Sequence, residues 1–84
     1  MTRHDPAAID PDLRARLAEF GVKVREHREK RDLSMRGAGR ETGLSYATFS
    51  RVEAGEAPDL RSLLVLARWI GLPLAWFDGD GDAR

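Results

Sequence analysis

Apolar residues recur along the first part of the chain with the spacing of one helix face. They stand four, three and four positions apart, at Leu13, Leu17, Phe20 and Val24. This spacing follows the 3.6-residue turn of an α-helix, and the opposite side carries charged residues. Asp10 and Pro11 have the character of a helix start, because aspartate caps unpaired amides and proline fits the first helical position. The pattern predicts a first helix that reaches about residue 30, with a polar outer face.

Beyond residue 32, polar residues and glycines divide the chain into shorter segments. The candidate helix caps are Ser34, Ser45 and Asp59, and the candidate helix ends are Gly43, Gly55 and Gly71. The segments between them predict helices over about 35–42, 46–54 and 60–70, and Pro73 can open a last turn through Phe77. No stretch shows the alternation of a half-buried strand. The expected fold class is therefore all α.

The 84 residues provide for one small domain. We expect residues 10–78 to form it, with residues 1–9 as a flexible N-terminal arm and residues 79–84 as an acidic disordered tail. The amino end lacks the pattern of a secretory signal, and no apolar run approaches the ~20 residues of a membrane span. A cytoplasmic location without membrane contact is the expectation.

The sequence lacks the residue patterns of most catalytic and metal-binding sites. There is no cysteine, so disulfides and thiolate metal centres are excluded. His4 and His27 have no further ligands at helical spacing, so no metal site is expected. There is no glycine-rich phosphate loop, no serine with a plausible histidine base and no carboxylate pair in a predicted cleft. We therefore expect no enzyme, no cofactor and no small-molecule substrate.

The formal net charge is zero, but the charges are unevenly distributed. Acidic residues cluster at the two ends, and residues 13–77 contain 12 basic and 8 acidic side chains, a net charge of about +4. This charge permits DNA binding, although it is smaller than that of a domain whose charge alone indicates nucleic acid.

The two short helices expected after Ser34 fit a helix-turn-helix. Such a motif needs a small residue where the helices touch, and Gly39 supplies it. Gly43 suits the turn, while Phe49 and Val52 give the second helix an apolar inner face. A generic helical hairpin meets the same requirements and stays an alternative at this point.

Over residues 19–78 the chain resembles the phage repressor and Cro type helix-turn-helix family, also called the XRE family. The matching positions are Gly43, Ser45, Glu53, Gly55, Pro58, Ala67 and Gly71. The resemblance implies a compact, lambda-repressor-like domain of five helices, here with an extended first helix, whose third helix reads DNA. It implies a transcription regulator, with repression as the expected sign, that binds double-stranded DNA as a homodimer. Twelve arginines against two lysines, with many alanines, indicate a GC-rich bacterial or phage genome.

The outer side of the expected recognition helix, residues 46–54, carries the candidate base contacts. These are Tyr46, Ala47, Ser50 and Arg51. Arg51 is the strongest, because a guanidinium can bond guanine O6 and N7 together. Its alternatives are an ion pair with Glu41 or a solvated charge. The candidate phosphate contacts, assisted by unpaired amides at helix starts, are Ser34, Arg36, Arg40, Ser45 and Arg61.

The resemblance also implies a structural ion pair between Arg28 and Glu53, which would fix the angle between the first helix and the motif.

A candidate homodimer or partner surface consists of Val65, Trp69 and Trp76. Val65 and Trp69 share the side of helix 60–70 that is opposite its main apolar face, and aromatic residues are common interface anchors. As alternatives, Leu13 and Leu17 could cover Trp69, and Trp76 could belong to the core.

A protein-binding module is the alternative function. In it, an antitoxin-like protein or phage immunity partner would keep the helix-turn-helix scaffold but bind DNA weakly. Met35 stands where the family commonly has a phosphate-binding glutamine, Gly37 weakens the second helix, and Glu56 and Asp59 add acidic charge after the third.

Overall fold

The computed structural model describes residues 10–78 and confirms the all-α fold class. The elements in this part of the chain are α1 (Pro11–Lys30), α2 (Met35–Thr42), α3 (Tyr46–Glu53), α4 (Leu60–Ile70) and the 3-10 helix η2 (Leu74–Asp78). The expected fifth helix is thus a short 3-10 helix, whereas the four α-helices lie where the sequence predicts them. None of the helices in the described part combines the length and apolar character that a membrane span requires. The expected N-terminal arm and acidic tail lie outside the described residues.

Each of the four α-helices begins after a side chain that accepts a hydrogen bond from an amide of the first turn. The capping residues are Asp10, Ser34, Ser45 and Asp59, with donor–acceptor distances of 2.9–3.1 Å. These predicted starts are confirmed. Helix α3 ends at Glu53, one residue earlier than predicted, and Ala54 is its C-cap.

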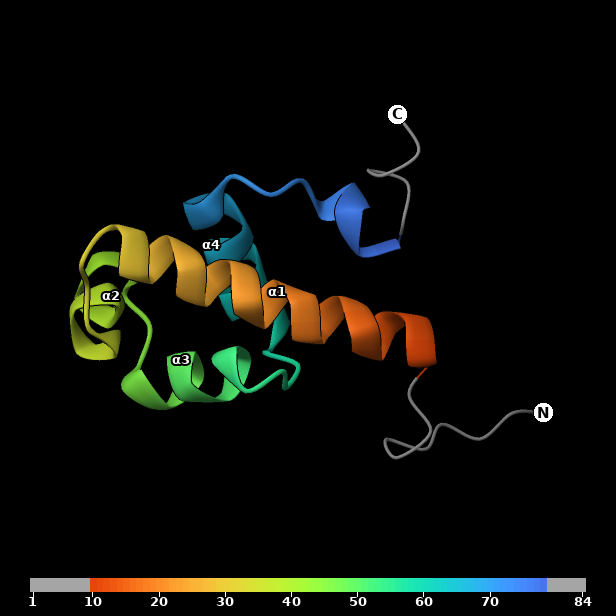
Figure 1. The fold of residues 1–84 in the computed structure, drawn as a ribbon, viewed down its shortest axis with the longest axis horizontal. Helices are drawn as coiled ribbons and strands as arrows, with labels where there is room; N and C mark the ends of the chain where they lie inside the picture. Colours follow the sequence, from red (N-terminus) through yellow and green to blue (C-terminus); the bar gives the residue numbers. More distant parts are fainter. Residues whose placement is uncertain (1–9, 79–84) are drawn as a thin grey trace.

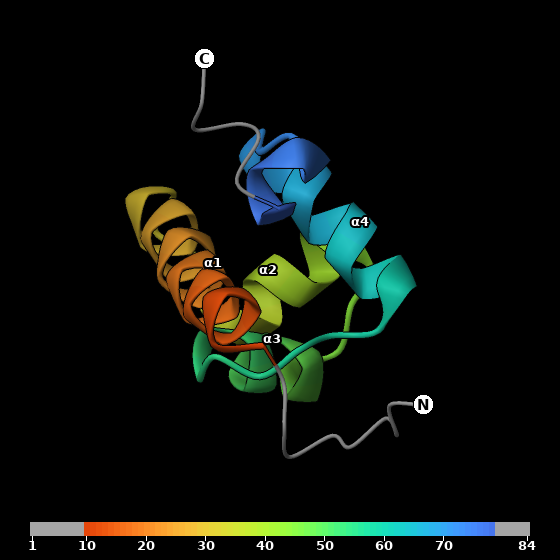
Figure 2. The ribbon, with the colours of Figure 1, turned by 90° about the vertical axis from the view of Figure 1, so that its right-hand side faces the viewer.

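Helix α1 lies across the rest of the domain (Figure 1) and packs against α3, α4 and η2. In the view from the N-terminal end of α1, α4 lies to the right, across the domain from α1, and α3 lies at the bottom (Figure 2). Helix α2 packs against both α3 and α4. The largest fully buried side chains at their meeting point are Phe20, Val24, Phe49, Val52 and Leu66.

The predicted inner face of α1 is buried along most of its length, but Leu13 departs from the prediction. Leu17, Phe20 and Val24 are buried, whereas Leu13 is 41% exposed. The first turns of α1 extend beyond α3 (Figure 1), so the apolar periodicity continues past the elements that could cover it.

Two close approaches of the backbone depend on glycine. Gly39 is buried, and a Cβ atom there would lie 2.5 Å from the carbonyl oxygen of Leu44, which confirms the predicted need for a small residue. At Gly21, a Cβ atom would collide with the carbonyl oxygen of Val52 where α1 crosses α3. The helix-turn-helix turn itself has Gly43 at φ +78°, as predicted.

Candidate nucleic-acid interface

The first turns of α2 and α3 both present a serine and the amides that it caps. Ser34 Oγ accepts from the amide of Gly37 at 3.0 Å, and Ser45 Oγ accepts from the amide of Thr48 at 3.1 Å. Both serines are exposed. With its oxygen occupied by the cap, Ser34 can donate its hydroxyl hydrogen to a phosphate. The Ser45 hydroxyl also shares a 3.0 Å hydrogen bond with Thr48 Oγ1, in which either oxygen can be the donor.

Arg36 and Tyr46 connect these two first turns. The guanidinium carbon of Arg36 lies 5.0 Å from the centroid of the Tyr46 ring, in the geometry of a cation–π contact. The sequence pattern predicts a phosphate contact for Arg36 and a base contact for Tyr46, but it does not predict that the two side chains meet. Tyr46 remains 49% exposed. The contact therefore holds a positive charge beside the first residue of the expected recognition helix.

Helix α3 has one buried and one exposed face. Phe49 and Val52 are almost fully buried, and the exposed residues include Ala47, Ser50 and Arg51. Within residues 10–78 no hydrogen bond or ion pair engages the Arg51 side chain. The alternative pair with Glu41 does not form, because Glu41 pairs with Arg31 at 2.7 Å instead.

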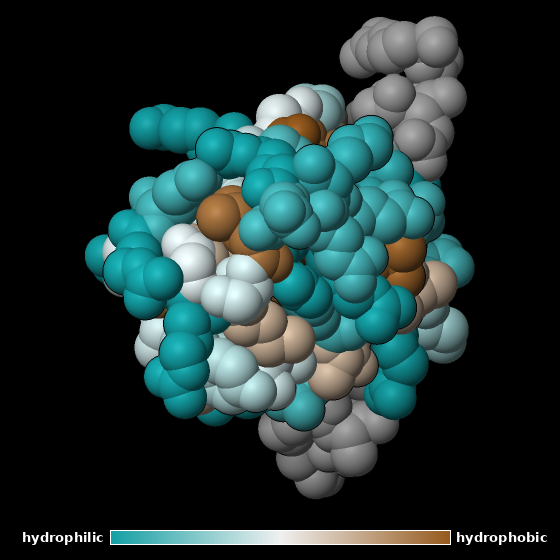
Figure 3. Space-filling model, turned by 60° about the vertical axis from the view of Figure 1, so that its left-hand side comes forward, coloured by the Kyte–Doolittle hydropathy of each residue, from teal (hydrophilic) through white to brown (hydrophobic). Residues whose placement is uncertain are grey.

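The remaining arginine candidates lie on α2 and α4. Arg40 is exposed and follows Arg36 by one turn on the same face of α2. The surface around α2 is largely hydrophilic, with hydrophobic side chains confined to small areas (Figure 3). Arg61 lies in the first turn of α4, in the wall of a groove between α2 and α4.

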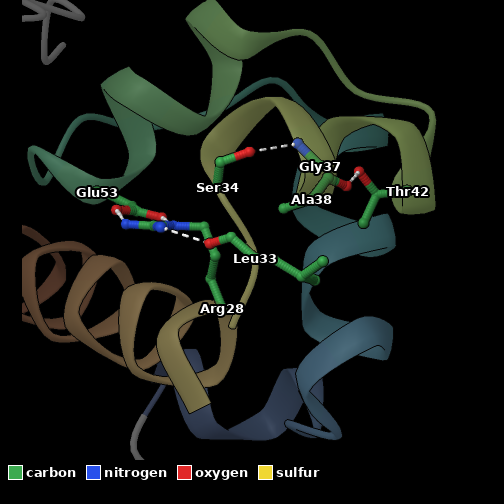
Figure 4. A network of polar contacts seen from close by, with 7 residues as sticks. All are labelled: Arg28, Leu33, Ser34, Gly37, Ala38, Thr42 and Glu53. Carbon is green, nitrogen blue, oxygen red and sulfur yellow. Dashed lines mark hydrogen bonds and ion pairs between the residues drawn. The ribbon is translucent and has the colours of Figure 1, made fainter. Parts of the chain in front are cut away.

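Arg28 and Glu53 form a two-point ion pair at the end of α3 (Figure 4). Arg28 Nε donates to Glu53 Oε2 at 2.8 Å and Nη2 donates to Oε1 at 3.0 Å. Nη1 donates to the carbonyl oxygen of Leu33 at 2.8 Å. The hydrogen bond with Glu53 raises the pKa of Arg28, so the guanidinium stays charged. One side chain thereby contacts α3 and the link between α1 and α2.

Trp76 is a core residue and does not form part of a partner surface. Its side chain is only 7% exposed, because η2 turns it against α1. The ring meets Phe77 edge-on at 5.1 Å, and the guanidinium carbon of Arg16 lies 4.8 Å from its centroid. The structure thus agrees with the alternative that assigned Trp76 to the core.

Trp69 is half-buried, and the C-terminal half of α1 covers it. The His27 ring meets it edge-on, with 4.5 Å between centroids, and its Nε1 donates to Glu41 Oε1 at 3.1 Å. The alternative in which Leu13 and Leu17 cover Trp69 is wrong, because those residues lie near the opposite end of α1. The contacts of Trp69 with His27 and Glu41 join residues far apart in the sequence, as does the contact between Arg36 and Tyr46. Helical periodicity therefore does not predict them.

The chain matches a family of known proteins. A family model described as a helix-turn-helix domain matches residues 19–76, from the middle of α1 to η2. The searches of curated proteins and of solved structures returned no match.

Proposed function

Since the chain belongs to the helix-turn-helix domain family, we propose that it is a sequence-specific transcriptional repressor that inserts α3 into the major groove of DNA. Family membership indicates a DNA-binding regulator; operator specificity, repression and the dimeric state are parts of our proposal. The proposed function involves no catalytic step, metal, cofactor or small-molecule substrate, and places the protein in the cytoplasm of a bacterial or phage-infected cell.

The exposed, unpaired guanidinium of Arg51 is the observation that carries this proposal. It stands on the outer face of α3, and the opposite face is held in the core by Phe49 and Val52. A guanidinium that has no partner within the described residues can bond guanine O6 and N7 without first breaking an ion pair. The further proposed base contacts are Tyr46, Ala47 and Ser50, which are also exposed on α3.

Phosphate contacts would position α3 in the groove. The unpaired amides and hydroxyl hydrogens at the starts of α2 and α3 suit this role, as do the exposed arginines of α2. The proposed residues are Ser34, Arg36, Arg40, Ser45 and Arg61. In a homodimer, two copies of α3 would enter half-sites about 34 Å apart, one turn of the duplex.

The first test is selection of binding sites from a random duplex library at ~100 mM salt, where several phosphate contacts still support binding. We expect an enriched inverted repeat with guanine at matching half-site positions. Arg51→Ala should then weaken binding to the selected site by about 1–3 kcal/mol and relax the preference for that guanine.

Arg14→Ala is the matched control for Arg51→Ala. Arg14 is also exposed, but it lies in the first turn of α1, far from the first turns of α2 and α3 (Figure 1). The affinity of the Arg14→Ala protein for the selected site should stay close to that of the wild type. Equal affinity and an unchanged base preference in Arg51→Ala would contradict the proposed base contact.

A protein-binding module, antitoxin-like or a phage immunity partner, is the second candidate function. Met35 favours it, because this residue packs against the core and has no donor for a phosphate. Exposed Glu56 and Asp59 after α3 also oppose a phosphate backbone. An unenriched library, together with partner binding that hardly changes between ~50 and 200 mM salt, would support this function over DNA regulation.

A further inference from the structure

A groove of about 730 Å³ runs along one face of α4, beside the last turn of α2. The apolar residues that line it all come from α4 and are Leu60, Leu64, Val65 and Trp69. Leu60 is 70% and Leu64 is 42% exposed, and Leu60 is the most exposed of the large hydrophobic residues in the described part of the chain. Neighbouring exposed apolar residues with a polar rim are typical of a surface that binds another protein.

The available charges of the groove are positive. Arg61 and Arg68 line it from α4, both are exposed, and within residues 10–78 no hydrogen bond or ion pair engages either guanidinium. Glu41 lines it from α2, but both of its carboxylate oxygens already contact Arg31, at 2.7 and 3.0 Å. Asp59 lies in the wall of a different cavity. The groove therefore offers two unpaired positive charges, and the carboxylate that lines it is already paired.

Helical geometry sets the order of these residues along the groove. Arg61 and Arg68 are seven residues apart, which is two turns of α4 and about 10.5 Å along its axis. Leu64 and Val65 lie between them, each three or four residues from both arginines and on the same side of the helix. The groove thus presents a positive charge, an apolar centre and a second positive charge, in the same order from either end.

We propose that the groove binds an acidic amphipathic helix of a different protein. This helix carries two acidic residues seven positions apart, which meet Arg61 and Arg68. Apolar residues at the third and fourth positions after the first acid lie on the same side of such a helix and pack against Leu64 and Val65. Because the order of charges is the same from either end, the helix can bind in both directions.

Two other occupants match this face less well. A second copy that used the same face of α4 would place arginine against arginine, in a parallel as in an antiparallel arrangement. A DNA backbone supplies the negative charge, but it is too polar to bury Leu60 and Leu64. An acidic amphipathic helix provides both the charge and the apolar surface.

The inference goes beyond the proposed DNA binding and does not depend on it, because it assigns a protein partner to a face away from the outer side of α3. It keeps Val65 and Trp69 from the expected partner surface and replaces buried Trp76 by the exposed leucines of α4. Arg61 is also a proposed phosphate contact. The charge is therefore tested at Arg68, which has no role in the proposed DNA binding.

The test begins with selection from a displayed library of random peptides of ~16 residues, about four helical turns, against the immobilised full chain. We expect enriched peptides in which two acids stand seven positions apart with apolar residues three and four positions after the first. One selected peptide is then synthesised with a fluorescent label, and its dissociation constant is measured by anisotropy. Replacing both of its acids by lysine should weaken binding at least ~tenfold.

Three variants locate the bound peptide. Leu64→Lys should raise the dissociation constant at least ~tenfold, because it places a charge at the apolar centre of the groove. Leu60→Lys is the second variant, at a position exposed enough to leave the fold intact. Arg68→Glu should weaken binding severalfold, and a peptide with one acid changed to lysine should bind Arg68→Glu more tightly than it binds the wild type. Circular dichroism verifies that each variant folds.

The matched controls are Leu74→Lys and Arg14→Glu. Leu74 is 50% exposed, much as Leu64 is, but it belongs to η2, and Arg14 is an exposed arginine in the first turn of α1. Neither residue lines the groove. Both variants should bind the peptide as the wild type does.

Three results would overturn the inference: a library without enriched peptides, enriched peptides that lack the acidic pattern, or peptide binding that Leu64→Lys and Leu60→Lys leave unchanged. Duplex DNA is the second probe, measured on the same variants. Weaker DNA binding in Arg68→Glu with unchanged peptide binding would also overturn it. Peptide binding in the groove by a chain that selects no duplex would retain the inference and reject the proposed function. DNA binding by a chain that enriches no peptide would do the reverse.

Discussion

The ring of His27 lies against Trp69 with no hydrogen bond to its buried Nε2 atom in the described structure. Burial, followed by the positive charge of Arg31, lowers the pKa of His27, although Glu41 acts in the opposite direction. The neutral imidazole is therefore the form that the fold accommodates. Protonation would introduce a charge where the ring is partly removed from water and close to a cation.

This lowered pKa predicts how stability depends on pH. In the unfolded chain His27 takes up its proton near pH 6.5, and in the folded chain it does so only at lower pH. Between the two pKa values the unfolded state binds more protons, so stability should decrease as the pH falls from about 7 towards 5. Urea unfolding at a series of pH values measures the effect.

His27→Phe is the informative variant, since it keeps a ring against Trp69 but cannot titrate. Its stability should change less than that of the wild type over the same pH range. His4→Gln removes the only other histidine of the chain and should leave the wild-type profile in place. A profile that is identical in His27→Phe and in the wild type would contradict the assignment to His27.

At the scale of elements, glycine determines how closely the helices pack. Helix α1 crosses α3 at Gly21, where the carbonyl oxygen of Val52 occupies the space that a Cβ atom would need. Gly37 in α2 is different, because a Cβ atom there would meet Ser34 Oγ at 3.4 Å and Leu33 Cδ2 at 3.5 Å, which is ordinary contact. Both glycines are helical, so helix propensity alone would treat them alike.

The two alanine variants should therefore change stability in opposite directions. Gly21→Ala should lower the free energy of unfolding by about 1–3 kcal/mol, because α1 and α3 must move apart. Gly37→Ala should raise it by about 0.5–1 kcal/mol, because alanine favours the helix and meets no clash. Thermal and urea unfolding measure both. Similar destabilisation by the two substitutions would show that the approach at Gly21 is not the cause.

The turn after α1 positions a backbone carbonyl for Arg28, the residue that connects α1 to α3. Asp32 adopts φ +60°, and the amides of Asp32 and Leu33 donate to the carbonyl oxygens of Glu29 and Arg28. This closes the helix with a left-handed residue, a position that glycine commonly fills. The same turn directs the carbonyl oxygen of Leu33 towards Arg28 Nη1 (Figure 4).

At the scale of the whole molecule, the pair between Arg28 and Glu53 connects α1 to α3. Its side chains are 13% and 4% exposed, so removing one partner would leave a charge partly buried and unpaired. In a double-mutant cycle with Arg28→Met and Glu53→Gln, measured by urea unfolding, we expect a coupling energy of about 0.5–3 kcal/mol. No coupling would contradict the expected structural role.

A second ion pair provides the comparison for this cycle. Arg31 and Glu41 also form a two-point pair, but their side chains are 45% and 37% exposed. Exposed pairs contribute little, so the cycle with Arg31→Met and Glu41→Gln should give a coupling below about 1 kcal/mol. Equal couplings would show that burial does not distinguish the two pairs.

The sequence by itself determined the helices of this protein and their starts. Asp10, Ser34, Ser45 and Asp59 cap helices where predicted, because a cap joins residues two or three positions apart. The inner face of α3 was predictable for the same reason, since residues three and four apart share a helix side. The base and phosphate contacts with DNA stay predictions, because they depend on a partner outside the chain.

The tertiary structure alone decided which segments meet. It exposed Leu13, placed Trp76 in the core and covered Trp69 with His27, although all four residues have ordinary positions in the helical pattern. It also made Gly21 the crossing point of α1 and α3. Periodicity identifies the side of a helix that is apolar, whereas burial depends on the length, angle and position of elements distant in the sequence.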